Sequence, residues 1–460
     1  MTSLLVQPSR IQRLNDRDLK KGSYVLYWMQ QSQRAEYNHA LEYALEQANA
    51  LGQGVLVGFG LTDNYPEANL RHYTFMLEGL RETQASLAGR GIKMVIQRGT
   101  PAGVASILGR KASLIVCDRG YLRHQKAWRT QVAQSASCPV VQVESDVIIP
   151  VEVVSDKAEY AARTIRPKVH KHLKEYLVPF KSSSADKSSL GLKVKGLDLS
   201  KVDTFLKKLS LDRSIAPVSQ FFKGGTSQGK ARLGEFLKTR FHHYVKNRNQ
   251  PQTDDISHMS PYLHFGQISP LYLALKIQAS GRRFAEARAA YLEELIVRRE
   301  LAVNFVYFNQ KYDSYSCLPQ WAQKTLKQHR KDPRENVYTR RQLEDAETHD
   351  DYWNAAMREM KITGFMHNYM RMYWGKKILE WCRTPEYAFR TALAINNKYF
   401  LDGRDPNSYA GVAWVFGLHD RAWFERPIFG KIRYMAASGL ERKCDIRGYV
   451  HKVDVLASSA

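Results

Sequence analysis

Cysteine is scarce in this chain of 460 residues, and none of its five cysteines lies in a Cys-x-x-Cys pair. The absence of such pairs excludes a zinc site or an iron–sulfur cluster built from a local motif, and no metal site is predicted. An odd, sparse set of thiols without a secretion signal is typical of a reduced, intracellular protein. The cysteines are Cys117, Cys138, Cys317, Cys382 and Cys444.

Long hydrophobic runs are missing as well. No apolar run approaches the ~20 residues that a membrane-spanning helix needs. The first residues, MTSLLVQPSRIQRLND, are too polar for a signal peptide. We therefore expect a soluble intracellular protein, cytoplasmic if its source is prokaryotic, with no membrane partner.

Acidic residues are few, because 45 Asp and Glu stand against 69 Lys and Arg, which gives a formal net charge of +24. Such an excess indicates a polyanionic partner, most simply nucleic acid, although a basic soluble protein without that partner would have the same composition. The charge is unevenly distributed, since residues 221–250 contain seven basic residues and a single acidic one, Glu235. This local concentration favours nucleic acid.

Residues 1–180 alternate short apolar runs with segments of helical spacing. The runs are typical of buried parallel strands, and the rhythm predicts an α/β, doubly wound, Rossmann-like parallel sheet. The expected strands are 24–29, 55–59, 92–96, 113–117 and 139–143, and the expected helices are 35–51, 69–88, 101–109 and 121–135.

The usual nucleotide-binding motifs are absent from this part of the chain. No Gly-x-Gly-x-x-Gly follows the first expected strand, and no Gly-x-x-x-x-Gly-Lys-Ser/Thr occurs anywhere. The residues alone therefore leave open whether this domain binds a ligand at the ends of its strands.

Two further regions follow. Residues 181–225 are rich in serine and lysine without sustained periodicity, and they are predicted to be an interdomain linker. Residues 226–460 are predicted to be all-α, with a loop over 254–269 that leads into a helix beginning near Pro270. The expected domains are thus 1–180 and 226–460.

The tryptophans are concentrated near the C-terminus, since five of the eight lie between Trp353 and Trp423. Residues 362–381 lack proline, and most of this range is predicted to form one helix. On that helix Arg371, Trp374 and Trp381 share a stripe, and the two indoles are two turns, about 10 Å, apart. Periodicity alone favours ordinary core for this stripe, but a buried arginine needs a partner.

These residues carry a family resemblance. MHNYMRMYWGKKILEW, followed by NNKYFLDGRDPNSYAGVAW, resembles the DNA photolyases, and among them the class II cyclobutane pyrimidine dimer (CPD) photolyases. The resemblance covers nearly the whole chain. It implies an α/β antenna domain with a possible deazaflavin or folate chromophore, whose site no motif identifies, and an all-α C-terminal FAD-binding domain.

The resemblance also assigns cofactor contacts. SHMSPYLHFG matches the loop that wraps the FAD pyrophosphate in photolyases, and its hydroxyls before a proline suit an anion, although an ordinary capped turn has the same composition. Asn396 corresponds to the class II side chain that faces flavin N5, and Asn407 is the alternative for that role. The implied FAD-binding residues are Tyr244, Ser257, His258, Met259, Ser260, Leu263, Arg298, Asn368, Arg371, Asn396, Asp402, Asp405 and Asn407.

Glu294 matches the photolyase carboxyl group that hydrogen-bonds the damaged pyrimidine, where a donor would stabilise the radical anion. Val297 departs from class I enzymes, which have a lesion-stacking tryptophan there. Trp414 matches the other stacking tryptophan of the family. The implied substrate or DNA contacts are Glu294, Met372, Trp414, Arg421, Trp423, Lys431 and Arg433, in which basic and aromatic residues interleave as strand binding requires.

The tryptophans can be interpreted as electron carriers as well as core residues. By resemblance, Trp374 would lie next to the flavin, Trp353 in the middle and Trp381 outermost in a chain that photoreduces the cofactor, although each could simply fill the core. The implied activity is that of a deoxyribodipyrimidine photolyase, a carbon–carbon lyase. It acts as a monomer on duplex DNA that contains CPDs, with the dimer flipped into the site and split by an electron from photoexcited FADH⁻.

Two other functions compete with this hypothesis. A cryptochrome-type photoreceptor would use the same flavin site for signalling, but the retained Glu294 and Trp414 and the basic segments favour repair. A helical nucleic-acid-binding protein without chemistry would be purified without flavin colour.

Overall fold

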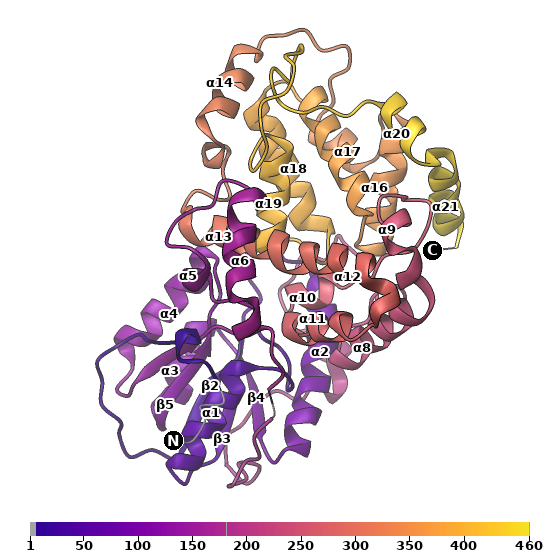
Figure 1. Cartoon of the computed structure of the whole chain (residues 1–460). Coiled ribbons are helices and arrows are strands. Elements are labelled where there is room, and N and C mark those ends of the chain that lie inside the picture. The colour runs from indigo at the N-terminus through magenta and orange to yellow at the C-terminus, as the bar shows by residue number, and fades with distance from the viewer. Residues whose placement is uncertain (1–5, 181, 460) are drawn as a thin grey trace.

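A computed structural model describes residues 6–180 and 182–459 of the chain as an α/β part followed by a mainly helical part (Figure 1). The predicted fold class, a doubly wound sheet joined to an all-α domain, is confirmed. The five cysteines are buried and unbridged. Within the described ranges, none of the helices combines the length and the apolar character that crossing a membrane would need.

The sheet of the α/β part has six strands in the order β1-β6-β5-β2-β3-β4. Strands β2 to β6 pair in parallel, and β1 is antiparallel to β6 at the edge. The five predicted strands are confirmed. Strand β1 was missed because its three residues, of which two are exposed, carry no apolar run. The bounds are β1 (Ile11–Arg13), β2 (Tyr24–Trp28), β3 (Val55–Leu61), β4 (Lys93–Arg98), β5 (Ala112–Asp118) and β6 (Val140–Val143).

Helices cover both faces of this sheet because alternate side chains of a strand point to opposite faces. Val25 and Tyr27 of β2 pack in one apolar cluster with α1 and α2, while Leu26 and Trp28 pack in another with α3 and α4. Asn38 starts α1 by accepting the N–H of Leu41. The helices are η1 (Pro8–Arg10), α1 (His39–Ala50), α2 (Leu70–Gly89), α3 (Pro101–Gly109), α4 (Arg123–Ser135), α5 (Val151–Val154) and α6 (Ala162–Tyr176).

The connection between the two parts lies along the open edge of the sheet. Ser189 N–H donates to Gly91 O at 2.9 Å, and Leu197 N–H donates to Ile96 O of β4 at 2.7 Å. The connection then forms η2 (Leu199–Lys201) and α7 (Val202–Leu206), whose apolar residues join the core beside α2. The segment predicted to be a linker is therefore packed against the α/β part, apart from Lys181, which lies outside the described residues.

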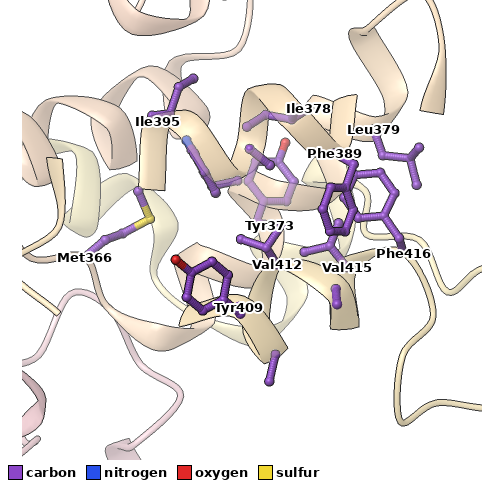
Figure 2. Close-up of a cluster of buried hydrophobic side chains, with 14 of the residues drawn as sticks. Met366, Tyr373, Ile378, Leu379, Phe389, Ile395, Tyr409, Val412, Val415 and Phe416 are labelled. Carbon is purple, nitrogen blue, oxygen red and sulfur yellow. The ribbon is translucent and has the colours of Figure 1, made fainter. Parts of the chain in front are cut away.

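The helical part holds the largest apolar cluster, and Figure 2 shows its packing where Leu379, Phe389 and Phe416 meet. Two turns in it are π-helical, η3 and η6. Its elements are α8 (Thr226–Glu235), η3 (Phe236–Arg240), η4 (Phe241–His243), α9 (Tyr244–Asn247), α10 (Ser260–His264), α11 (Pro270–Gln278), η5 (Arg282–Phe284), α12 (Ala285–Leu292), η6 (Glu293–Arg298), α13 (Arg299–Phe308), η7 (Tyr315–Cys317), α14 (Gln320–Gln328), α15 (Arg340–Glu344), α16 (Asp351–Thr363), α17 (Asn368–Trp381), α18 (Pro385–Tyr399), α19 (Pro406–Val415), α20 (Ala437–Lys443) and α21 (Ile446–Ser458).

The helix predicted over most of residues 362–381 is present as α17, which begins at Asn368. The preceding residues belong to α16 and to a turn, because Gly364 adopts the left-handed conformation (φ 73°) and ends α16. Helix α17 begins afresh at Asn368, where Nδ1 of His367 accepts the N–H of Tyr369. The break turns the chain, so that α16 and α17 lie side by side and bring their tryptophans together.

Buried polar contacts join the two parts. The Arg299 guanidinium pairs with Asp146 at 3.0 Å, and the Glu300 carboxyl accepts the N–H groups of Ile148 and Ile149. Burial raises the pKa of Glu300 to about 8, and the hydrogen bond from Ile148 only partly opposes this shift. The start of α13 is thereby fixed to the loop after β6.

Candidate functional site

Three tryptophans meet between α16 and α17. Trp353 donates its indole N–H to the backbone carbonyl of Trp374 at 3.0 Å, and its ring lies 5.6 Å from that of Trp381 in an edge-on arrangement. All three side chains are buried, and Trp374 packs 6.3 Å from the ring of Phe400. Trp353 thus contacts the ring of Trp381 and the backbone of Trp374, while the order of the three as an electron route stays a prediction.

Arg371 forms a bidentate ion pair with Asp402. The two guanidinium nitrogens lie 3.0 Å from the two carboxylate oxygens, and Nε donates to Met366 O at 2.9 Å. The guanidinium also stacks on Phe400 at 3.9 Å and faces Phe365 at 5.2 Å. This pairing gives the half-buried arginine on the stripe of α17 a carboxylate partner, and it fixes a planar cation against Phe400.

The two candidate asparagines occupy different surroundings. Asn396 on α18 is buried, and its amide N–H₂ contacts Ser408 Oγ and donates to Asn397 Oδ1. Asn407 is exposed, and both its backbone N–H and its side-chain amide donate to Asp405, the N-cap residue of α19. Asn396 therefore has the enclosed position, whereas Asn407 is engaged in capping. Ser408 was not singled out in the sequence because a lone serine carries no signal.

The loop before α10 places its polar groups in a half-buried setting. His258 has a left-handed backbone (φ 53°), its Nε2 lies 2.6 Å from Asp254, and its ring is edge-on to Phe365. Ser257 Oγ accepts the hydroxyl of Tyr291 at 2.8 Å. A histidine held in a strained backbone indicates a position constrained by its surroundings.

The other predicted cofactor contacts near this loop lie on α9, on α10 and just before α10. Met259 is buried, Ser260 begins α10, and Leu263 is half-buried on the same helix. Tyr244 begins α9 and packs 5.4 Å from Tyr291, where burial raises the pKa of Tyr244 to about 12. The loop and α9 therefore border one region.

The residues of this region fit FAD. Nδ1 of His258 and Nε1 of Trp374 are both buried, and neither has a hydrogen-bond partner within residues 6–180 and 182–459. Buried polar atoms are rarely left unpaired in native proteins, so a polar ligand is expected beside them. The Arg371–Asp402 pair and the enclosed amide of Asn396 add donors and acceptors suited to an isoalloxazine edge.

Glu294 lies in the π-helical turn η6, a local geometry that is frequent at functional sites. Its side chain is 44% exposed and pairs with Arg248 at 3.2 Å, so it can be reached by a large ligand. Arg298, in the same turn, is half-exposed and faces Glu293 at 3.4 Å. Glu293 also pairs with Arg166 of α6 at 2.8 Å, which holds Arg298 in a surface network.

Three other predicted positions can be placed. Val297 is buried in the core and offers no surface for stacking. Asn368 is exposed at the first residue of α17, and Met372 is half-buried one turn later.

Trp414, near the end of α19, has a charged neighbour that was not predicted. Lys376 of α17 is completely buried, its Nζ lies 5.0 Å from the Trp414 ring centre, and it donates to Val415 O. Burial lowers the pKa of Lys376 to about 7, with Arg433 adding to the shift. The pair Lys376–Lys377 appears in the sequence as an ordinary solvated helix face, which is why the buried one was missed.

The basic and aromatic segment after α19 forms a surface. Arg421 and Arg433 lie 5.3 and 4.9 Å from the Trp423 ring, and the backbone N–H of Trp423 donates to Lys431 O. Phe424, beside it, is 90% exposed. Cations and exposed rings are therefore presented together, as binding to a nucleic acid requires.

A cavity lies between the two parts, at the carboxyl ends of the strands. It holds about 950 Å³ of space not filled by protein atoms, open solvent at its mouth included. The helical part lines it with His264, Arg299 and Asp405, and His264 Nδ1 lies 3.4 Å from Asp405. Residues of the α/β part that line it include Gln30, Gln31, Leu61, Tyr65, Tyr121 and Trp128. No sequence motif marked it, because it forms only where the two parts meet.

Comparisons with known proteins define the class of this fold. The chain is 17% identical to a class III photolyase from Agrobacterium tumefaciens, with a TM-score of 0.75 over 94% of this chain and 87% of that one. It is 15% identical to an archaeal photolyase from Sulfolobus tokodaii whose structure holds two FAD molecules, with a TM-score of 0.69 over 94% and 92% of the two chains. The architecture is thus that of the photolyases.

Sequence similarity gives the family. Residues 25–185 match the family model described as DNA photolyase. The chain is also 50% identical to the deoxyribodipyrimidine photo-lyase of Methanothermobacter thermautotrophicus, over 98% of this chain and 99% of that one. The chain belongs to the DNA photolyase family, and the predicted family and enzyme are confirmed.

Proposed function

We propose that this chain is a class II photolyase that repairs cyclobutane pyrimidine dimers in DNA with light and reduced FAD. The observation that carries the proposal is the set of polar groups on α17 and the elements beside it. These groups are the Arg371–Asp402 pair, the enclosed amide of Asn396, and Trp374 Nε1, which has no hydrogen-bond partner among the described residues. The buried Val297, at the place of the class I stacking tryptophan, supports class II.

The chain's own residues would hold the cofactor and the lesion. Arg371 and Asn396 would orient the isoalloxazine, and the loop over Ser257 to Leu263 would receive the pyrophosphate. Reduced FAD held there would supply the photochemical electron for opening the cyclobutane ring, with no net redox change. Glu294 would hydrogen-bond the damaged base, and Trp414 would stack on it.

DNA binding follows from charge and shape. The net charge of +24 supplies non-specific affinity that falls with salt. A dimer in the duplex is hidden in the stack, so it must be flipped out into the site, which its weakened base pairing makes less costly. The cation and aromatic surface around Trp423 would contact the opened strand.

The cavity between the two parts would hold an antenna chromophore. Its aromatic lining, with Tyr65 and Trp128 in edge-on contact at 6.1 Å, suits a flat conjugated ring, and its polar groups would fix the orientation of that ring. A repair action spectrum broader than the absorption of the flavin would support this assignment.

The function is tested by illuminating the reduced protein with CPD-containing DNA and measuring restored pyrimidines. Glu294→Ala is expected to lower the repair yield several-fold, because the hydrogen bond to the base is lost, while flavin stays bound. Glu293→Gln is the matched control, because the carboxylate of Glu293 is next to Glu294 in the sequence but pairs with Arg166 and Arg298. Equal repair by Glu294→Ala and wild type would remove Glu294 from the mechanism, and intact dimers with the wild type would reject the function.

A further inference from the structure

A groove lies beside helix α4, between that helix, the segment that follows β1 and Tyr307 of α13. Helix α4 lines the cavity between the two parts with Gln125 and Trp128, whereas it lines the groove with Thr130 and Gln134. At 100° per residue these two pairs point to roughly opposite sides of the helix, so the groove is distinct from the cavity. The groove holds about 1320 Å³ of space not filled by protein atoms, open solvent included.

Hydrogen bonds hold the walls of the groove in place. Asn15, after β1, donates from Nδ2 to Ala133 O at 3.0 Å and accepts the N–H of Val140 at 3.0 Å. Gln142 of β6 accepts Nε of Arg129 at 2.9 Å. The segment after β1, helix α4 and β6 are thus joined to one another, and the groove has its shape before a ligand binds.

Cations dominate the lining of the groove, where the only carboxylate among the described residues is the exposed Asp16. The cations are Arg17, Arg119, Lys126 and Arg129. Arg119 is neutralised, because it pairs with Glu144 and Glu152 at 3.0 and 2.8 Å. The other three cations form no ion pair within residues 6–180 and 182–459. The groove therefore carries positive charge that the protein does not compensate.

Arg129 has the strongest need for an anion, because its side chain is only 8% exposed. Its Nε and Nη2 donate to neutral oxygens, Gln142 Oε1 at 2.9 Å and Gly120 O at 2.6 Å. Such acceptors solvate a guanidinium but leave its charge uncancelled, whereas buried charges in proteins are generally paired. An anion in the groove would supply the missing partner.

Lys126 is the second fixed cation of the groove. Its Nζ donates to Tyr307 O at 2.9 Å and lies 4.3 Å from the centre of the Tyr307 ring. The pKa of Lys126 is lowered to about 8, first by burial and then by the charges of Arg129 and Arg119, which Glu152 only partly opposes. Cations that lower one another's pKa indicate a region of positive potential.

The lining also indicates which kind of anion fits. Guanidinium and ammonium groups are the donors that bind phosphate oxygens in proteins, and the space exceeds that of a single phosphate. Tyr307 is the one aromatic side chain that lines the groove in the described part of the chain. Lys126 and Arg119 already lie 4.3 and 4.9 Å from the centre of its ring, so recognition depends on charge rather than on stacking of a base.

We propose that this groove binds the phosphate groups of a multiply phosphorylated ligand. Arg129 and Lys126 are its fixed cations, and the exposed Arg17 adds a third from the segment after β1. Such phosphates occur in free polyphosphate compounds and in the backbone of a nucleic-acid strand, and the groove offers both the same donors. The proposal requires neither FAD nor the repair reaction.

The test is isothermal titration calorimetry of the flavin-loaded protein with sodium tripolyphosphate. Wild type should bind this probe with an affinity that falls as salt is added. Lys126→Gln should weaken binding about tenfold, because a charge-assisted contact to phosphate is lost. Lys171→Gln is the matched control, since it removes the same charge from an exposed position on α6, outside the groove. Repair of CPDs should be unchanged in both variants.

A charge-preserving variant separates electrostatic binding from a structural role of Lys126. Because the pKa of Lys126 is about 8, tripolyphosphate binding by wild type should weaken from pH 7 to 9, whereas Lys126→Arg should show no such decrease. The other titratable groups that face Lys126 are Arg119, Arg129, Glu152 and Tyr307, and none of these types of group ordinarily titrates in that interval.

A second probe, an undamaged single-stranded oligothymidylate, identifies the source of the phosphates. If its affinity falls more in Lys126→Gln than in Lys171→Gln while tripolyphosphate does not bind, the ligand of the groove is a nucleic-acid strand. Arg17→Gln, at an exposed position, should weaken the same binding and keeps the test valid if Lys126→Gln alters folding. The proposal is overturned if Lys126→Gln, Arg17→Gln and Lys171→Gln bind both probes equally well.

Discussion

Lys376 carries an ammonium group into the core of the helical part, beside Trp414 and under the end of α19. Because burial lowers its pKa to about 7, its charged and neutral forms are both populated near neutral pH. Its hydrogen bond to Val415 O ties α17 to α19. A residue that a sequence pattern assigns to solvent thus positions the tryptophan proposed to stack on the lesion.

The stability of the protein should show this titration. Below pH 7 Lys376 is protonated in both the folded and the unfolded protein, whereas between about pH 7 and 10.4 only the unfolded chain keeps the proton. Stability therefore rises with pH in that window. We expect the Tm of wild type, relative to that of Lys376→Met, to increase from pH 7 to 9. Lys377→Met is the neighbouring control, and a Tm difference that is constant with pH would contradict the assignment.

At the scale of the elements, apolar runs located all five parallel strands to within about two residues, because strands covered on both faces have no polar positions to interrupt them. The break at Gly364 was missed, since the helical spacing continues on both sides of it. The π-helical turn that displays Glu294 was also missed, because π-helical and α-helical residues have the same composition. Local geometry of this kind is decided by packing.

The pairing of α16 with α17 makes a prediction about electron transfer. Trp353→Phe removes the indole between Trp374 and Trp381, so photoreduction by an external thiol should fall several-fold. Repair by chemically reduced protein should stay at the wild-type level, because repair needs no electron from outside. Trp321→Phe, on α14, is the matched control. Photoreduction at the wild-type rate in Trp353→Phe would show that electrons take another route.

At the scale of the whole molecule, the two-part organisation could be predicted from the change in pattern along the chain, but the interface between the parts could not. Its contacts join residues more than a hundred positions apart, such as Arg299 with Asp146. The candidate site likewise has features that could be predicted from the sequence and features that could not. The family resemblance identified Arg371 and Asp402, whereas the cavity could be found only from the three-dimensional structure, because residues of both parts line it.

The interface should make stability depend on pH through Glu300. Its folded pKa of about 8 lies above the unfolded value near 4.3, so between these values the folded protein holds one more proton and loses stability as pH rises. Glu300→Gln keeps an acceptor for the N–H groups of Ile148 and Ile149 but cannot ionise. The Tm of Glu300→Gln minus the Tm of wild type should therefore increase from pH 5 to pH 8. The exposed Glu286→Gln should show no such gain, and parallel curves for Glu300→Gln and wild type would disprove the effect.

Helix α19 begins at the cavity wall, where Asp405 caps it, and carries Trp414 near its other end. Ten residues of α-helix make a rigid rod about 15 Å long. A chromophore bound against the first turn would thus keep a constant distance and orientation relative to the site of the damaged base. The efficiency of energy transfer from that chromophore would then be set by the rigid fold rather than by thermal motion.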